Sequence, residues 1–437
     1  MKVKIIGAGL AGCEAALQLA KRGIEVDLYE MRPKKMTGAH TTEKLAEFVC
    51  SNSMGSYDIS NASGLLKKEL ELLGSELIKI AVENRVPAGN ALAIDREIFS
   101  QKVTEEILEN PLINLIRDEV AEIPEGNVII ASGPLTSDTM AKSIQNFTQE
   151  DHLHFFDAVA PIVEKDSINF DKAFYASRYD KGEASYINCP MNKEEYENFY
   201  RILTTAERIE LKEFEKDAKF FESCLPVEVL ASRGVDTLRF GPMKPVGLID
   251  RRTNEKSYAV VQLRQDNSIK TLYNIVGFQT NLKWSYQKEL IHSIPGLENA
   301  NIVRYGVMHR NTFLNSPKIL TANLNTIKRP DLFFAGQITG VEGYTESMAS
   351  GLLAGINMAK FVKGETLLTL PKETILGALL AYITDKNHKQ LQPVNSNWAL
   401  INHGIEFPKN IRKDKKAKAE ILGKRSLDTL NGVLSHL

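Results

Sequence analysis

The sequence contains few cysteines and no long apolar run. Its four cysteines, Cys13, Cys50, Cys189 and Cys224, are widely separated along 437 residues, so neither a disulfide framework nor a CxxC metal site is expected. No uninterrupted apolar stretch approaches the roughly 18 residues needed to cross a bilayer. The first residues, MKVKIIGAGLAG, are interrupted by glycines and followed by no small-residue cleavage site, unlike a signal peptide. We therefore expect a cytoplasmic protein that binds neither a membrane nor a metal.

The net charge of -1 conceals a basic segment near the C-terminus. Residues 409–425 contain eight Lys or Arg and only two acidic residues, so the rest of the chain is acidic. A basic segment on an acidic body suits a phosphate-binding patch. An ordinary solvated surface helix is the alternative, and the composition leaves both interpretations open.

Residues 3–30 carry the most specific pattern, a strand, a glycine-rich turn, a helix and a second strand. The turn has the spacing G-x-G-x-x-G: its first glycine permits a tight bend, its second admits a pyrophosphate, and its third lets helix and strand pack closely. The helix that follows offers its N-terminal N–H groups to the phosphates. The predicted cofactor contacts from this turn are Gly7, Ala8, Gly9, Leu10, Ala11 and Gly12.

An acidic residue, Glu30, follows the second strand at the position that binds a ribose 2′-hydroxyl. A carboxylate there disfavours a 2′-phosphate, so the pattern predicts NAD or the ADP half of FAD. A strand, a glycine turn and a small-residue helix at 330–361 suit the rest of an extended dinucleotide, with Gly336, Gln337 and Gly343 as contacts. The helix that begins near Gly343 is placed to stabilise a reduced flavin with its positive end. Because an NAD dehydrogenase needs no such distant element, FAD is preferred.

The pattern changes between these two cofactor segments, where strand candidates alternate with charged helices. We predict an α/β protein with a Rossmann-like, doubly wound FAD-binding domain formed by residues 1–139 and 326–437. Residues 140–325 are predicted to form an inserted second α/β domain, and the C-terminal segment is predicted to be mostly helical. No second G-x-G-x-x-G occurs, so any NADH or NADPH binds without a Rossmann domain of its own.

Two of the cysteines lie where an apolar segment meets a polar one. Cys50 is followed by Ser-Asn-Ser, and Cys224 stands two residues before a proline. A loop in either place can bring a thiol to a cleft, and a thiolate is strongly nucleophilic. Cys13 and Cys189 are instead predicted to be structural.

Longer segments follow one another in a recognisable order. They are GAGLAGCEAA, YEMRP, CSNS, VPAGNALAIDR, PIVEKDSI, SRYDKGE, YINCPM, CLPVEV, FGPMKPVGL, VQLRQDN, LYNIVGFQT, RYGVMHRNTF and FFAGQITGVEGYTES. From residue 1 to about 361 they resemble TrmFO, the family of folate- and FAD-dependent tRNA (uracil-5-)-methyltransferases. These segments are more specific than a general flavoprotein signature.

The resemblance implies that 5,10-methylenetetrahydrofolate supplies a one-carbon unit, which reduced FAD carries, and that NADH or NADPH regenerates the reduced flavin. The implied acceptor is the T-loop uridine at tRNA position 54. Uracil C5 becomes nucleophilic when a thiolate adds to C6, and a base must later remove the C5 proton. By match to the family motifs, Cys224 is the expected nucleophile. Cys50 is the expected second thiol, as base or as protection for the flavin, and the division of roles between the two stays open.

The resemblance suggests a folate contact, and the residue pattern suggests further cofactor and RNA contacts. His309 is the expected cover for the folate pteridine, with Tyr344 in the same pocket, although a single histidine is more often structural. Asp95 is expected to contact flavin or folate, or else to cap the helix that begins at Arg96. The expected RNA contacts are Lys283, Lys409, Arg412 and Lys413, beside the ring of Trp284.

One departure from the family pattern stands close to Cys50. Met54 and Gly55 follow the CSNS segment, where the family commonly has a larger aliphatic residue and a basic one. This change affects loop flexibility, flavin contact or RNA contact. A 23S rRNA uridine is an alternative acceptor for the same chemistry. A flavin-dependent oxidoreductase and an RNA-binding protein with structural FAD, both without methyl transfer, are the alternatives of a different class.

Overall fold

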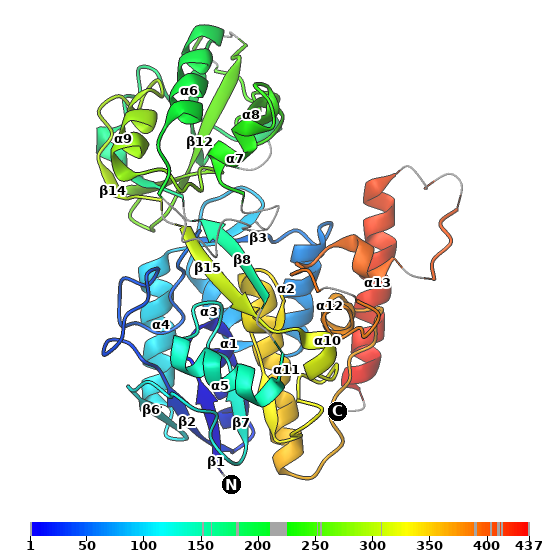
Figure 1. The fold of residues 1–437 in the computed structure, drawn as a ribbon. Helices are drawn as coiled ribbons and strands as arrows, with labels where there is room; N and C mark the ends of the chain where they lie inside the picture. The colour runs from blue at the N-terminus through cyan, green and yellow to red at the C-terminus, as the bar shows by residue number, and fades with distance from the viewer. Residues whose placement is uncertain are drawn as a thin grey trace.

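The computed structural model consists of two bodies, a larger one that contains both ends of the chain and a smaller one inserted into it (Figure 1). Within the described chain, no helix is long and apolar enough to span a membrane. For residues 153–158 and 308–310 the structure describes the backbone alone. The described residues are 2–150, 153–158, 160–180, 183–209, 225–250, 252–253, 256–306, 308–388, 391–402, 404–408, 411 and 414–435.

A five-stranded parallel sheet forms the centre of the larger body. Its strand order is β16-β7-β1-β2-β6, and each neighbouring pair is parallel. The apolar side chains of the three central strands are buried, as expected for a parallel sheet covered by helices. The predicted Rossmann-like α/β class is confirmed. The strands are β1 (Lys2–Ile6), β2 (Glu25–Tyr29), β6 (Ile113–Ile116), β7 (Val128–Ile130) and β16 (Leu332–Phe334).

Helices α1 (Leu10–Lys21) and α11 (Tyr344–Val362) pack closely together because small residues face each other. A β-carbon added at Gly351 of α11 would lie 2.3 Å from the carbonyl oxygen of Ala11 in α1, so only glycine fits there. The other helices of this body are α2 (Ala62–Leu72), α3 (Glu76–Glu83), α4 (Arg96–Glu109), α5 (Asp138–Thr148), α10 (Ser316–Ile319), α12 (Ile375–Ile383) and α13 (Lys415–Leu434).

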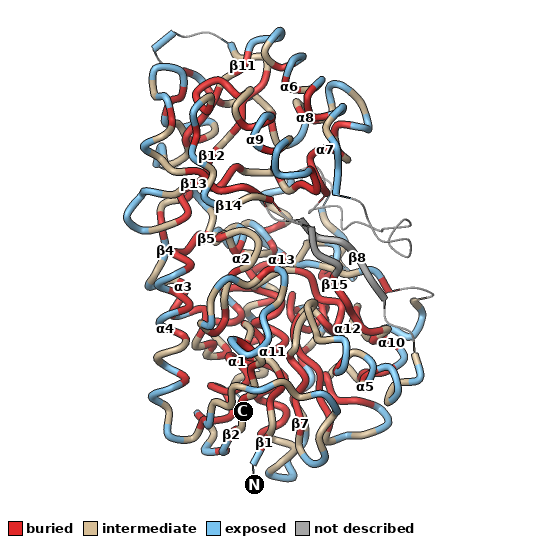
Figure 2. The backbone as a smooth tube through the Cα atoms, turned by 60° about the vertical axis from the view of Figure 1, so that its left-hand side comes forward, coloured by how far each residue is buried: buried red, intermediate tan, exposed pale blue. Residues whose placement is uncertain are grey.

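The smaller body is built on an antiparallel sheet of order β10-β11-β12-β13-β9-β14 and has a hydrophobic core of its own (Figure 2). Tyr196 and Phe199 of α6 are fully buried in this core. The strands are β9 (Ile162–Glu164), β10 (Phe174–Ala176), β11 (Tyr186–Met191), β12 (Ala259–Gln265), β13 (Leu272–Ile275) and β14 (Ile302–Arg304). The helices are α6 (Lys193–Thr205), α7 (Val227–Ser232), α8 (Thr237–Phe240) and α9 (Trp284–His292).

An antiparallel ribbon of β8 (Leu153–Ala158) and β15 (Met308–Phe313) joins the two bodies (Figure 1). A small sheet of β3 (Ser53–Ser56), β5 (Ala91–Ile94) and β4 (Arg85–Val86) belongs to the larger body. The core of the larger body also includes Met140, Ile144 and side chains from Phe313 onward. The domain boundaries at 139/140 and 325/326 stay a prediction.

A buried carboxylate anchors the C-terminal helices to the larger body. Glu69 of α2 accepts hydrogen bonds from the main-chain N–H groups of Ile375 and Leu376 at the start of α12, and from the hydroxyl of Ser426 in α13. Helix α13 therefore has a fixed position, and Lys415, Lys416 and Lys424 on it are exposed. This exposure agrees with either of the two interpretations of the basic segment.

Candidate functional site

A cavity lies at the carboxyl ends of the parallel strands, between the glycine turn after β1 and the start of α11. Ligands of open α/β sheets bind at this edge. Residues 132–137 after β7 line another side, and Thr37 and His40, which the sequence analysis did not name, also line it. The predicted ligand contacts that line the cavity are Gly7, Gly9, Leu10, Ala11, Glu30, Gly336, Gln337 and Tyr344.

The glycine turn fits an extended dinucleotide. Gly7 has φ +102, and a β-carbon there would lie 2.6 Å from the carbonyl oxygen of Ala131. A β-carbon on Gly9 would meet no atom within 4 Å, which leaves the start of α1 accessible to a phosphate. A β-carbon on Gly12 would lie 1.8 Å from the Gly7 oxygen, so Gly12 serves helix packing. The residues present therefore fit the pyrophosphate of FAD.

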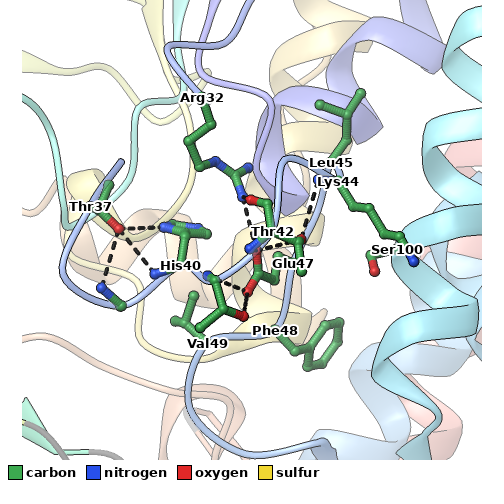
Figure 3. Close-up of polar contacts among 12 residues, drawn as sticks. Arg32, Thr37, His40, Thr42, Lys44, Leu45, Glu47, Phe48, Val49 and Ser100 are labelled. Atoms are coloured by element: carbon green, nitrogen blue, oxygen red, sulfur yellow. Dashed lines mark hydrogen bonds and ion pairs between the residues drawn. The ribbon is translucent and has the colours of Figure 1, made fainter. Parts of the chain in front are cut away.

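A buried arginine organises the acidic side of the cavity (Figure 3). Arg32 donates from Nε to Glu30 Oε1 at 3.0 Å. It also donates from Nη1 to Glu47 Oε2 at 3.1 Å. The second carboxylate oxygen of Glu30 accepts the N–H of Ala8 at 3.2 Å. Burial alone would raise the pKa of Glu30, but the hydrogen bond and charge of Arg32 outweigh it and hold the pKa below its ordinary value. Glu30 thus stays ionised beside the glycine turn.

Glu47 holds the loop that closes this side of the cavity (Figure 3). Its carboxylate accepts the main-chain N–H and the hydroxyl of Thr42. It accepts the same two groups of Thr41. In the same loop Thr37 Oγ1 lies 2.6 Å from His40 Nδ1. The sequence did contain a signal for this contact, because the arginine of the YEMRP segment stands two residues after Glu30. The sequence analysis did not use that signal.

The start of α11 forms the opposite side of the cavity. Gly336 donates its N–H to Ser350 Oγ at 2.7 Å, and Gln337 donates from Nε2 to Glu342 Oε2 at 2.9 Å. Gly343 caps α11 with φ +114, a conformation that favours glycine. The helix N-terminus therefore begins at Tyr344, a residue of the cavity lining.

Cys50 lies beside this cavity. Its neighbour Val49 lines the cavity, and the main-chain N–H of Cys50 donates to the Tyr344 hydroxyl at 2.8 Å. The rings of Phe48 and Tyr344 pack with centroids 4.2 Å apart. Cys50 is half-buried, whereas Cys13 is fully buried and donates to the Ala8 carbonyl. The structure thus brings Cys50 and Tyr344 together across 294 residues of sequence.

The other buried cysteine agrees with its predicted structural role. Cys189 lies on β11 within the core of the smaller body. Burial raises the pKa of both the Cys13 and the Cys189 thiol well above the ordinary range. Neither thiol is therefore suited to nucleophilic chemistry.

The departure from the family pattern after the CSNS segment has a structural account. Met54 is buried in the core of the larger body. Gly55 has φ +78, and a β-carbon there would lie 2.9 Å from Ser63 Oγ. A side chain at position 55 would therefore be strained in this backbone conformation, and glycine relieves that strain.

Asp95 caps the helix that begins at Arg96, which is the second of the two roles considered for it. One carboxylate oxygen accepts the N–H groups of Glu97 and Ile98 and so caps α4. The other accepts the N–H of Ser268, which belongs to the smaller body. Asp95 is absent from the residues that line the cavity, so its contact with the cofactor stays a prediction without structural support.

An aromatic pair is exposed on the smaller body. The ring of Trp284 stacks on Tyr305 with centroids 5.3 Å apart and planes 13° from parallel. Trp284 is 59% exposed, and the adjacent Lys283 forms an ion pair with Glu207. Tyr305 follows Arg304, which donates to the carbonyl oxygen of Val49. The pair is therefore on the same body as the arginine that contacts the Cys50 loop.

Several predicted contacts fall outside the described residues, and their roles stay predictions. These are Cys224, Lys409, Arg412, Lys413 and the side chain of His309, whose backbone pairs with Asp157. Among the residues that the structure describes, no cluster of three His, Cys, Asp or Glu side chains is suited to hold a metal ion.

Comparisons with known proteins agree with this architecture. The family model described as glucose inhibited division protein A matches residues 2–366. The chain is 56% identical to the methylenetetrahydrofolate–tRNA-(uracil-5-)-methyltransferase TrmFO of Bacillus velezensis over 431 residues, covering 99% of this chain and 98% of that one. It is also 56% identical to TrmFO of Anoxybacillus flavithermus over the whole of both chains. The solved structure of Aquifex aeolicus GidA superposes with a TM-score of 0.68 at 17% identity, covering 98% of this chain and 73% of that one, which supports the fold.

Proposed function

Because this chain belongs to the TrmFO family of methylenetetrahydrofolate–tRNA-(uracil-5-)-methyltransferases, we propose that it methylates C5 of a uracil in tRNA. The carbon donor is 5,10-methylenetetrahydrofolate, and FAD occupies the cavity at the edge of the parallel sheet. We further propose NADH or NADPH as the reductant and the T-loop uridine at position 54 as the acceptor.

The observation that carries the proposal is the position of Cys50. A flavoprotein that only oxidises a small molecule needs no thiol in a loop against the dinucleotide cavity. Here the Cys50 N–H is bonded to Tyr344, which lines that cavity, and the loop lies where the two bodies meet. This arrangement suits a reaction in which a large substrate and a dinucleotide must meet at one thiol.

The proposed roles rest on the positions of Glu30, Cys50 and Tyr344 in the structure and, for Cys224 and His309, on the family resemblance alone. When bound, FAD supplies the one-carbon transfer and the redox chemistry. Glu30 binds the adenosine ribose, and the start of α1 binds the pyrophosphate. Cys224 forms a bond from its sulfur to uracil C6, which makes C5 nucleophilic, and Cys50 removes the C5 proton. His309 covers the pteridine of the folate, with Tyr344 in the same pocket.

Trp284 is proposed to stack on a base of the RNA. We expect Trp284→Ala to weaken tRNA binding about 5- to 150-fold, because stacking of one base on an aromatic ring contributes about 1–3 kcal/mol. Fluorescence titration with tRNA at two salt concentrations measures this effect. The salt dependence should be unchanged, since no charge is removed.

Phe240→Ala is the matched control, because Phe240 is also an aromatic residue of the smaller body and is 81% exposed. It should bind tRNA as the wild type does. Equal affinities of the Trp284→Ala variant and the wild type would show that the ring does not contact RNA.

The activity itself is tested by incorporation of label from methylenetetrahydrofolate, with FAD and NADH, into tRNA that lacks 5-methyluridine. We expect label at the T-loop uridine. Unmodified 23S rRNA serves as a parallel substrate. Label found only there would support the same chemistry with rRNA, in place of tRNA, as the acceptor. Absence of label in both, from protein that binds FAD and oxidises NADH, would contradict methyl transfer.

A further inference from the structure

Three arginines from distant parts of the chain form hydrogen bonds with the residues on either side of Cys50. Arg96 at the start of α4 donates from Nη1 to the carbonyl oxygen of Phe48 at 3.4 Å. Arg304 at the end of β14 donates from Nη2 to the carbonyl oxygen of Val49 at 2.9 Å. These two contacts fix the chain immediately before Cys50.

The third arginine fixes the chain after the cysteine. Arg264 of β12 donates from Nη2 to Ser51 Oγ at 2.7 Å and from Nε to Asn52 Oδ1 at 3.0 Å. In return, Asn52 Nδ2 donates to the carbonyl oxygens of Ile94 and Gln265. Because Arg264 and Arg304 belong to the smaller body, the loop that carries Cys50 is one place where the two bodies contact each other.

The arrangement concentrates positive charge. Arg96 forms an ion pair with Asp266 at 2.6 Å. In the contacts named above, Arg264 and Arg304 donate to neutral oxygens. The side chains of Arg96, Arg264 and Arg304 are all largely buried. Guanidinium groups stay charged in proteins, so such a cluster favours an anion among them.

The electrostatics of the three arginines support this conclusion. Burial and the charge of Arg96 lower the pKa of Arg264, against the opposite effects of Tyr186 and Asp266. Burial and Arg96 also lower the pKa of Arg304, against the opposite effects of Tyr344, Glu47 and Asp266. Burial also acts to lower the pKa of Arg96, but Asp266, Tyr344 and Cys50 outweigh it and raise the value. The Nε of Arg96 is buried and makes no hydrogen bond to a described residue. A negative charge on Cys50 would therefore relieve repulsion within the cluster.

We propose that Arg96, Arg264 and Arg304 act as positioning residues that hold Cys50 as a thiolate at neutral pH. The purpose of this thiolate rests on the proposed function. In that reaction the C5–H bond of the methylated uracil adduct breaks and an S–H bond forms at Cys50. The electron pair of C5–H forms the C5–C6 double bond, and the C6–S bond breaks to return the thiolate of Cys224.

Other charged and titratable groups face the same loop, and they set the sign of each expected change. Asp266 and Asp95 oppose the arginines, Glu47 belongs to the cysteine's own loop, and Tyr344 approaches from α11. Tyr186 interacts with Arg264. Removing a positive group should make Cys50 harder to ionise, and removing a negative group should make it easier.

The pH profile of Cys50 alkylation by iodoacetamide, followed by mass spectrometry in the FAD-loaded protein, tests the proposal. For Arg304→Gln and Arg264→Gln we expect the midpoint to rise by about one pH unit or more, so that the rate at pH 7 falls about tenfold. Arg304→Lys should recover much of the wild-type rate because it restores the charge. Asp266→Asn should lower the midpoint, an opposite shift that loosening of the fold does not produce.

Arg178→Gln is the matched control. Arg178 also lies on the smaller body and donates to the carbonyl oxygens of Val246 and Lys244, but it is not in the Cys50 cluster. Its alkylation profile should equal that of the wild type. Folded Gln variants with an unmoved midpoint, or an Asp266→Asn midpoint that does not fall, would overturn the proposal. Alkylation needs neither folate nor RNA, so its result is independent of whether the chain methylates tRNA.

Discussion

Cys50→Ala is expected to lower the rate of methyl transfer by about 10²–10⁴-fold, the usual contribution of a positioned acid or base. The variant should remain folded and yellow with bound FAD. The reason is that Cys50 holds its loop through its main-chain N–H, which alanine retains. The initial rate of label incorporation into tRNA and the visible flavin absorbance measure the two outcomes. Cys224→Ala is expected to remove methyl transfer as well, because it removes the nucleophile.

Cys189→Ala provides the control for both thiols. Cys189 is fully buried in the core of the smaller body, so its loss should lower stability and leave the rate per folded molecule unchanged. Full activity in either Cys50→Ala or Cys224→Ala would remove that residue from the proposed chemistry.

Gly9→Val is expected to weaken FAD binding without unfolding the protein. Gly9 has φ -75, which valine adopts without strain, and a β-carbon there meets no protein atom within 4 Å. The valine would occupy the space of the pyrophosphate instead. Overpacking costs about 1–3 kcal/mol, which corresponds to a rise in Kd of roughly 5- to 150-fold. Flavin fluorescence during titration measures the Kd, and circular dichroism reports the fold.

Gly12→Ala gives the contrasting result. Its β-carbon would lie 1.8 Å from the Gly7 carbonyl oxygen, so we expect a loss of stability of about 3 kcal/mol or more, with or without FAD. Thermal unfolding of the FAD-free protein separates the two variants. Wild-type FAD affinity in Gly9→Val would show that the pyrophosphate does not approach this turn.

Local patterns in the sequence were sufficient to predict an element where the contacts that determine it are close along the chain. The strand–turn–helix at 3–30 was predictable because its glycines act on their own backbone. The helix beginning after Gly343 was predictable for the same reason. The sequence pattern at Asp95 was compatible with both roles considered for it, and only the hydrogen bonds of its side chain show that it caps α4.

The sequence by itself determined the FAD-type fold, the family and the cysteine that lies beside the cavity. Only the tertiary structure decided how that cysteine is surrounded. Arg264 and Asn52 are 212 residues apart, and Arg96 and Asp266 are 170 apart, so no local pattern joins them. The bond between Arg32 and Glu47 also depends on a loop whose path is set by packing. Charge around a catalytic group comes from side chains of several elements, and folding alone brings these elements to one place.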